Sequence, residues 1–557
     1  MNNNLSNRLI QVIIIVVSSL LFIPFLGHIH LFDWDEINFA EAAREMIVTK
    51  NYLTVQIDFQ PFWEKPPLFI WMQVLSMKIF GINEFAARFP NALCGIVTLL
   101  VLYHIGRKLV NSHFGLLWVL AYASSILPFF YFKSGIIDPW FNLFIFLGIY
   151  YASQNILTNT PKNKIIYISL SAFFIGLGIL TKGPVALLIY GLTFAILLSI
   201  KMFRIKINFL HVLLFAIILV LVGGFWFILQ AMNGNFQIIK DFMIYQVRLF
   251  STKDAGHGGF FLYHFVVLFL GVFPASVFAL RSFRPERKYD REPVHEFKNW
   301  MMILFWTVLI LFTLVKTKIV HYSSLCYFPL TFLSAYVIFK FHELKQRIPT
   351  WMKTLIICLT IFWGLIIIGL QLIVMNKEKI IASGIISDQF AIGNLHADVP
   401  WNGYEFLIGI IFIVVITLLY VSHKLSQKTQ IIATFIFTLL FTYATMLYIT
   451  PRIEGYTQHA AIEFYKDKQK EDCYIQTLGF KSYAHLFYFN KQKPSNPNSW
   501  NETWLLTGNI DKPVYFVIKN YMCKEYLDRY PQLKIQYEKN GYVFVKRDIN
   551  PKIMLSK

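Results

Sequence analysis

Long apolar runs dominate this 557-residue chain and restrict what it can fold into. Roughly 20 apolar residues span a bilayer core as a helix, and by that standard about thirteen segments qualify. The residues are 56% hydrophobic and only 15% charged, which excludes a soluble enzyme of ordinary composition. The predicted segments are 9–31, 88–106, 114–132, 139–155, 164–180, 183–200, 208–231, 259–280, 299–316, 321–340, 351–375, 404–423 and 428–449. We therefore expect a polytopic α-helical membrane protein.

The net charge of +20 comes from lysines and arginines in alternate loops. This alternation follows the positive-inside rule and predicts a cytoplasmic N-terminus. Contact with anionic membrane lipids accounts for the excess, so no nucleic-acid partner is expected. Examples on the predicted cytoplasmic side are Arg8, Arg107, Lys162, Lys201 and Arg281.

Two domains are predicted, a membrane domain over residues 1–449 and a small α/β domain over residues 450–557. The odd number of spans places the second domain on the outer side of the membrane. Residues 473–478, 514–518 and 542–545 have strand composition, and Asn540-Gly541 is a hairpin signal. Cys473 and Cys523 lie in this compartment, where a disulfide between them could persist, although sequence alone does not decide it.

The first outer loop, residues 32–87, carries two charged clusters. Asp33-Trp34-Asp35-Glu36 lies at the mouth of the first predicted span, where carboxylates are costly and usually functional. The alternative is a helix cap. Further along, Glu64-Lys65 stands between Trp63 and Pro66-Pro67, and the alternative there is a weak surface ion pair. Residues 39–47 and 68–80 predict amphipathic helices lying in the membrane interface.

The remaining outer loops carry further candidates. Asp138 precedes Pro139 at the start of a span, where it is either a catalytic acid or a plain helix cap. Basic residues on this side are unusual, and together they predict an anion site for a phosphate, unless each merely extends to the interface. These residues, with a tyrosine beside them, are Lys182, Arg248, Lys316, Lys318 and Tyr322. His257, among glycines, is a candidate metal ligand.

Several motifs in order carry a family resemblance. Asp35-Glu36-x-x-Phe39-Ala40-Glu41-x-x-Arg44-Glu45-Met46 is followed by Phe62-x-Glu64-Lys65-Pro66-Pro67 and then by Phe80-Gly81-x-Asn83-Glu84-Phe85-x-x-Arg88. This series resembles the bacterial aminoarabinose lipid A transferases and the wider dolichyl-phosphate-mannose protein mannosyltransferase family of GT-C glycosyltransferases.

The resemblance implies an inverting glycosyltransferase that takes a sugar from a polyprenyl-phosphate donor. Asp35 then becomes the essential carboxylate, with Glu36 and Asp138 as further catalytic candidates. Glu64 and His257 match positions that contact a divalent metal. Lys65, Lys182, Arg248, Lys318 and Tyr322 match the lipid-phosphate site.

The acceptor stays open between a lipid A-type molecule, which the first-loop motifs favour, and a protein hydroxyl. A polytopic transporter is the rival class, and it predicts ionisable residues near the bilayer midplane.

Overall fold

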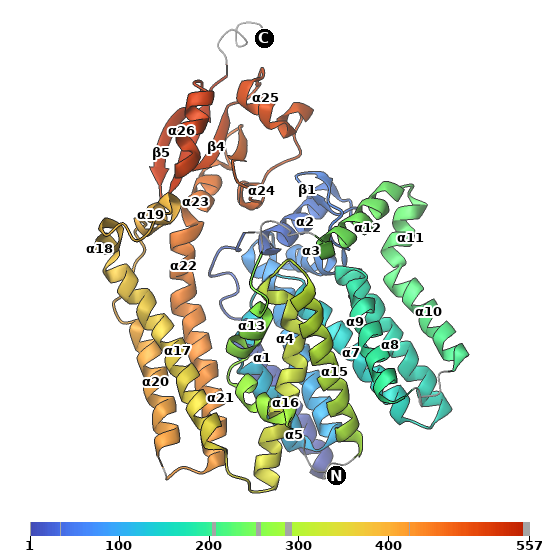
Figure 1. The fold of residues 1–557 in the computed structure, drawn as a ribbon. Coiled ribbons are helices and arrows are strands. Elements are labelled where there is room, and N and C mark those ends of the chain that lie inside the picture. The colour runs from blue at the N-terminus through green and yellow to red at the C-terminus, as the bar shows by residue number, and fades with distance from the viewer. Residues whose placement is uncertain are drawn as a thin grey trace.

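Apolar helices packed side by side form most of the molecule (Figure 1). The structure is a computed structural model that describes residues 2–33, 35–202, 208–251, 258–284, 292–422 and 424–549. Each predicted span overlaps one helix or two consecutive helices, although the first helix ends at Phe22 and not at the predicted Leu31. They are α1 (Asn2–Phe22), α4 (Glu84–Leu109), α5 (Ser112–Ala123) with α6 (Ile126–Tyr131), α7 (Asp138–Leu157), α8 (Pro161–Lys182), α9 (Val185–Ile200), α10 (Phe209–Gly223) with α11 (Phe225–Met232), α13 (Tyr263–Gly271) with α14 (Ala275–Ala279), α15 (Glu292–Leu314), α16 (Tyr327–Glu343), α17 (Thr350–Met375), α20 (Phe406–Val421) and α21 (Gln427–Ala444).

Two predicted spans are bent. By length and composition, 6 helices in the described ranges can cross a membrane, or up to 8 if each bent pair is one span. Helices α10 and α11 meet at 58°, and α13 meets the helical segment Ala275–Phe283, which begins with α14, at 111°. Pro274 has no amide hydrogen and cannot continue α13, so residues 259–280 do not form the single straight helix predicted.

Helix α2 (Asp35–Thr49) of the first outer loop is buried on every side from Glu36 to Met46. The prediction that it lies in the membrane interface is therefore wrong. Arg44 forms an ion pair of 2.6 Å with Glu41 and donates to the carbonyl of Lys491 at 2.8 Å. These partners satisfy the polar face inside the protein. Helix α3 (Leu68–Phe80) does expose Leu75, as an interfacial helix should.

The C-terminal sheet has the order β3-β4-β6-β5, with β3 and β4 parallel and the other pairs antiparallel. The predicted strands are confirmed as β3 (Tyr474–Leu478), β4 (Val514–Lys519) and β6 (Tyr542–Arg547). Strand β5 (Lys534–Lys539) was not predicted; it lies at the edge of the sheet, and all its residues are exposed. Asn540 and Gly541 have φ of 53° and 78°, which confirms the tight hairpin turn. Cys473 and Cys523 are free thiols.

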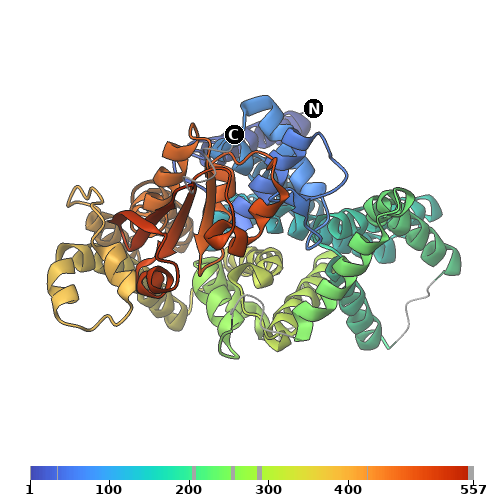
Figure 2. The same ribbon diagram turned by 90° about the horizontal axis from the view of Figure 1, so that it is seen from above.

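The C-terminal sheet domain and the first outer loop share one hydrophobic core, which contains Phe39 and Met46 from α2 and Tyr465 and Phe487 from the tail. Figure 1 shows the sheet domain at the same end of the bundle as α2 and α3, opposite the N-terminus. Seen from above, the sheet lies next to the first-loop segments (Figure 2).

Short helices connect the bundle to the sheet domain. The helix that begins as α21 continues through residues 445–449 and α22 (Thr450–Thr457), past the predicted boundary at 449. Helix α23 (His459–Lys468) then begins the tail's own packing, and α24 (Ala484–Tyr488), α25 (Glu502–Thr507) and α26 (Asn520–Arg529) flank the sheet. In the bundle, α18 (Lys377–Ala382) and α19 (Gln389–Leu395) form the loop that meets this domain.

Candidate active site

A cavity of about 600 Å³ lies where α7 begins and α8 ends. Its wall combines the first outer loop, α12 (Phe236–Ser251), the 3₁₀ turn Val320–Cys326 and the tail. The charged and polar side chains that line it are Asp33, Asp35, Glu36, Asn38, Glu64, Lys65, Asp138, Asn142, Lys182, Tyr245, Gln246, Arg248, His321, Tyr322, Lys481 and Tyr483. The structure thus gathers candidates from five distant segments of the sequence into one site.

A chain of close polar contacts crosses the cavity. Asp35 Oδ2 lies 3.3 Å from His321 Nε2, which lies 4.0 Å from Asp138 Oδ2. Asp138 Oδ1 in turn accepts a hydrogen bond of 2.6 Å from Lys182 Nζ. Asp138 is only 3% exposed, whereas Asp35 is 41% exposed. Of these two carboxylates, Asp35 is therefore the one that is open to a ligand, whereas Asp138 holds Lys182 in place.

Local structure explains why Asp138 and Lys182 meet. Asp138 opens α7 with a proline behind it, so the helix dipole favours its charge. Lys182 is the last residue of α8, where a cation is favourable. Gly183 ends that helix with φ of 103°, and a Cβ there would come within 2.9 Å of Phe242. Glycine is thus needed both for the backbone turn and for the close approach of α12.

Two cations flank one aromatic ring on another wall. The Lys65 ammonium lies 5.1 Å and the Arg248 guanidinium 5.2 Å from the ring centre of Tyr245. Burial lowers the pKa of Lys65 below its usual range, and Lys182 adds to this effect, while Glu64, Asp35 and Asp138 oppose it. The electrostatic coupling of Lys65 to these residues agrees with their shared position around the cavity.

Glu36 reaches the cavity wall, but all its partners are within the protein. Its carboxylate accepts hydrogen bonds from Arg88 at 2.9 and 2.8 Å and from the amides of Phe32 and Gly135. Burial alone would raise the pKa of Glu36, yet Arg88 and the amides outweigh burial and lower it. This fully hydrogen-bonded carboxylate positions the start of α2 and has no free lone pair for a substrate.

Two predicted phosphate ligands do not line the cavity. Lys316 is exposed and does not line it. Lys318 is 8% exposed, and its ammonium donates to the carbonyls of Phe312, Thr313 and Val315. Lys318 therefore caps the end of α15, where orphan carbonyls need donors.

The structure adds residues that sequence reasoning did not assign. His321 belongs to the motif around Tyr322, and its link to Asp35 became visible only in three dimensions. Lys481 and Tyr483 come from the tail, where no catalytic motif was recognised. The Tyr483 amide donates to Asp33 Oδ1 at 3.1 Å, which ties the tail to the first outer loop. No sequence signal marks this contact.

Of the two residues predicted to bind a metal, only Glu64 lies within the described residues. Glu64 lines the cavity and offers an oxygen ligand, whereas His257 lies outside the described residues. Within the described ranges, the cavity contains no group of three His, Cys, Asp or Glu ligand atoms close enough to hold an ion. A metal at this place stays a prediction.

Comparison with known proteins agrees with this architecture. A family model described as dolichyl-phosphate-mannose-protein mannosyltransferase matches residues 64–226. The crystal structure of ArnT from Cupriavidus metallidurans bound to undecaprenyl phosphate superposes with a TM-score of 0.73 at 15% identity, covering 96% of this chain and 97% of that one. The fold is that of the GT-C glycosyltransferases. This GT-C fold confirms the resemblance that the sequence motifs carry.

Curated relatives match a shorter part of the chain. An undecaprenyl phosphate-alpha-4-amino-4-deoxy-L-arabinose arabinosyl transferase of Proteus mirabilis is 26% identical over 318 residues, 57% of this chain and 56% of the relative. A transferase with the same description from Photorhabdus laumondii is 26% identical over 316 residues, 55% of each chain. The chain thus spans little more than half the length of these relatives.

Proposed function

We propose that this protein is an inverting glycosyltransferase that moves a sugar from a polyprenyl-phosphate donor to a lipid A-type acceptor. One observation carries the proposal: an exposed carboxylate, Asp35, shares a cavity with the cations Lys65, Lys182 and Arg248. The arrangement supplies one group for the sugar or the acceptor and several for a leaving phosphate. The likeness to an ArnT bound to undecaprenyl phosphate supports the same donor class.

The reaction breaks the bond between sugar C1 and the phosphate oxygen and forms a bond from C1 to an acceptor oxygen on the opposite face. The electron pair of the broken bond leaves with the polyprenyl phosphate. Negative charge therefore grows on the phosphate in the transition state. Lys65 and Arg248, positioned before reaction, stabilise that charge. A divalent metal held at Glu64 would add to this stabilisation when bound.

The acceptor decides what Asp35 does. A phosphate acceptor is already anionic, so Asp35 orients it or stabilises the developing sugar cation. A serine or threonine hydroxyl must lose a proton, and Asp35 then accepts it as general base. The second possibility, protein O-glycosylation, is favoured by the description of the matching family model. The names of the curated relatives favour an aminoarabinose donor and hence the lipid A-type acceptor.

The site faces the outer side of the bacterial inner membrane in this proposal. The sheet domain and helices α2 and α3 of the first outer loop lie at the end of the bundle opposite the N-terminus (Figure 1), and residues of this loop line the cavity. Positively charged loops at the N-terminal end support a cytoplasmic N-terminus. A transporter would instead need its ionisable groups near the midplane. The cavity is built from helix ends and loops, which suits transfer at the membrane surface.

Lipid analysis tests the proposal. Mass spectrometry of lipid A and of surface glycoproteins should show a sugar that is present with the intact protein and missing with Asp35→Asn. The variant should insert and unfold as the wild type does, because Asp35 is partly exposed. Glycan loss confined to proteins would favour the second acceptor. Full transfer by Asp35→Asn would exclude the role given to Asp35.

A further inference from the structure

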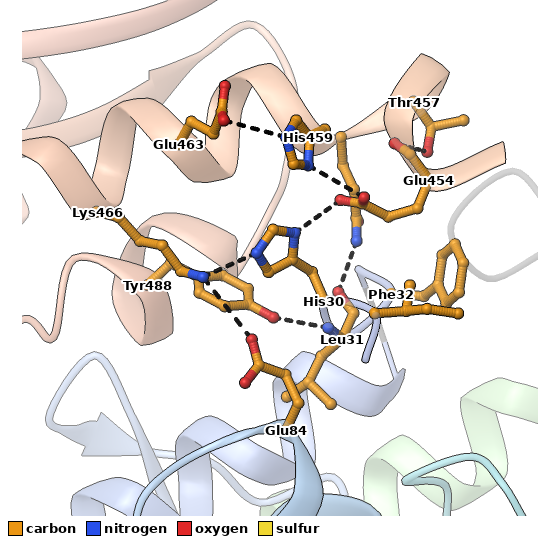
Figure 3. A network of polar contacts seen from close by, with 12 residues as sticks. His30, Leu31, Phe32, Glu84, Glu454, Thr457, His459, Glu463, Lys466 and Tyr488 are labelled. Carbon is orange, nitrogen blue, oxygen red and sulfur yellow. Dashed lines mark hydrogen bonds and ion pairs between the residues drawn. The ribbon is translucent and has the colours of Figure 1, made fainter. Parts of the chain in front are cut away.

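Two histidines from distant parts of the chain face one buried carboxylate (Figure 3). His30 Nδ1 lies 2.9 Å from Glu454 Oε1, and His459 Nδ1 lies 3.1 Å from Glu454 Oε2. The ligand atoms of the three side chains all lie within 4.8 Å of one another. His30 precedes the first outer loop, whereas Glu454 and His459 belong to α22 and α23. None of the three lines the catalytic cavity.

The spacing suits a transition-metal ion. Ligand atoms about 2.0–2.2 Å from a tetrahedral zinc ion are roughly 3.4 Å apart. The two nitrogen–oxygen distances are a few tenths of an ångström shorter than that, so small side-chain shifts admit an ion. Two imidazoles and one carboxylate select a metal such as Zn²⁺ over Mg²⁺ or Ca²⁺, which prefer oxygen ligands.

Outer contacts prepare one imidazole for this role. His459 Nε2 lies 3.1 Å from Glu463 Oε1, as Figure 3 shows. With an ion bound, the Glu463 carboxylate holds the proton of His459 on Nε2 and leaves Nδ1 free to coordinate the ion. This is the carboxylate–histidine arrangement that orients metal ligands. Because His459 is 37% exposed, an ion can reach the site from solvent.

The other imidazole must exchange a contact. Lys466 Nζ lies 2.8 Å from His30 Nε2, so in the metal-free state it donates there and the Nδ1 proton points to Glu454. Metal binding at Nδ1 shifts this single proton to Nε2, so His30 stays neutral and Nε2 can no longer accept from Lys466. Lys466 then turns to Glu84, whose Oε1 is already 3.9 Å away. The site therefore has a metal-free and a metal-bound arrangement.

We propose that His30, Glu454 and His459 bind a divalent transition metal, Zn²⁺ in the first instance, with water completing the coordination. The ion joins the bundle and the tail next to the segment that leads to Asp35. The tail already binds that segment, since the Gln458 side chain donates a hydrogen bond of 2.7 Å to the carbonyl of Leu31. The site is separate from the predicted metal at Glu64 and His257 and does not depend on the reaction proposed above.

Metal stoichiometry tests this site on the full-length chain. The protein is purified in detergent with its affinity tag removed, stripped with EDTA, and titrated with Zn²⁺. We expect His459→Ala and Glu454→Gln each to bind one equivalent fewer than wild type, with His28→Ala unchanged as the matched exposed control. Glu64→Gln should keep this equivalent. Mg²⁺ at equal concentration should not compete.

Stability gives a second readout that does not require activity. Zn²⁺ should raise the midpoint of thermal unfolding of the wild type and of His28→Ala, but not of His459→Ala. The metal-free variants should unfold near the metal-free wild type, which separates loss of binding from loss of folding. Equal Zn²⁺ binding by wild type and His459→Ala, or loss of the ion in Glu64→Gln alone, would overturn the proposal.

Discussion

Glu36 and Asp35 are neighbours in sequence, yet the structure predicts opposite consequences of changing them. Glu36 and Arg88 form an ion pair in which each side chain is only 6% exposed. Every partner of the Glu36 carboxylate is a donor. In Glu36→Gln the new amide NH₂ group must face one of these donors, and the Arg88 charge loses its counter-ion. The variant should therefore be a folding mutant and not a catalytic one.

The expected loss of stability in Glu36→Gln follows from the burial of the Glu36–Arg88 ion pair. Removing one partner of a buried ion pair costs about 3–5 kcal/mol. Arg88→Gln should cost a similar amount, because Arg88 also donates to the carbonyls of Leu26, Ile29 and His30. The double variant should be less destabilised than the sum of the two by about 2–3 kcal/mol.

The stabilisation that the Glu36–Arg88 ion pair contributes should decrease in acid. Because the pKa of Glu36 is lowered in the folded protein, its stabilisation is complete above the usual value of 4.5. It is lost as the pH falls below that value toward the folded-state pKa. The difference between wild type and Glu36→Gln should therefore shrink in acid.

Two measurements distinguish a structural role of Glu36 from a catalytic one. Equilibrium unfolding in mixed micelles gives the free energies for the cycle, and a transfer assay on the folded fraction gives kcat and KM. We expect Glu36→Gln to lose stability while its folded fraction retains most of its kcat. Asp35→Asn should keep wild-type stability and lose transfer. If Glu36→Gln unfolded like the wild type but lost transfer a hundredfold or more, Glu36 would act on the substrate and our reasoning would be refuted.

Three further substitutions test other parts of the structure. Burial and neighbouring Glu41 raise the pKa of Glu45 to about 9, so the stability that the protonated group contributes is lost as the pH rises between 4.5 and 9. At pH 8 the free energy of unfolding of Glu45→Gln should therefore exceed that of the wild type by at least about 1 kcal/mol. The difference should be smaller at pH 5. Lys481→Ala should raise a substrate KM by roughly tenfold, about 1.4 kcal/mol, with unfolding unchanged; an unchanged KM would remove the tail from the site. Lys318→Met should lose about 1–3 kcal/mol of stability at unchanged KM, with Lys316→Ala as a neutral control; a raised donor KM without destabilisation would restore Lys318 as a phosphate ligand.

The parts of the fold set by local chemistry were predictable. Twenty-residue apolar runs leave few alternatives to spanning helices, and Asn540-Gly541 fixes a hairpin through its positive φ angles. The order of motifs correctly indicated a cavity containing Asp35, Asp138 and Lys182. These predictions rest on single segments or on a family pattern.

The roles of individual charges were not predictable, because a role depends on partners far away in sequence. Glu36 looks catalytic beside Asp35 until Arg88, 52 residues later, occupies its carboxylate. Lys318 looks like a phosphate ligand until its ammonium is seen to bind three carbonyls at and just beyond the end of α15. His321 gains its importance only from the approach of Asp35.

The burial of α2 shows why the tail cannot be treated as an appendage. A helix with Glu41, Arg44 and Glu45 on one face normally places that face in water. Here the tail supplies the Lys491 carbonyl to Arg44, and its aromatic residues share the core of α2. Removing the tail would leave an ionic cluster and an apolar surface without their partners, next to the helix that carries Asp35. We therefore expect the tail to hold the first outer loop, and with it Asp35, in place, although the tail has no catalytic motif of its own.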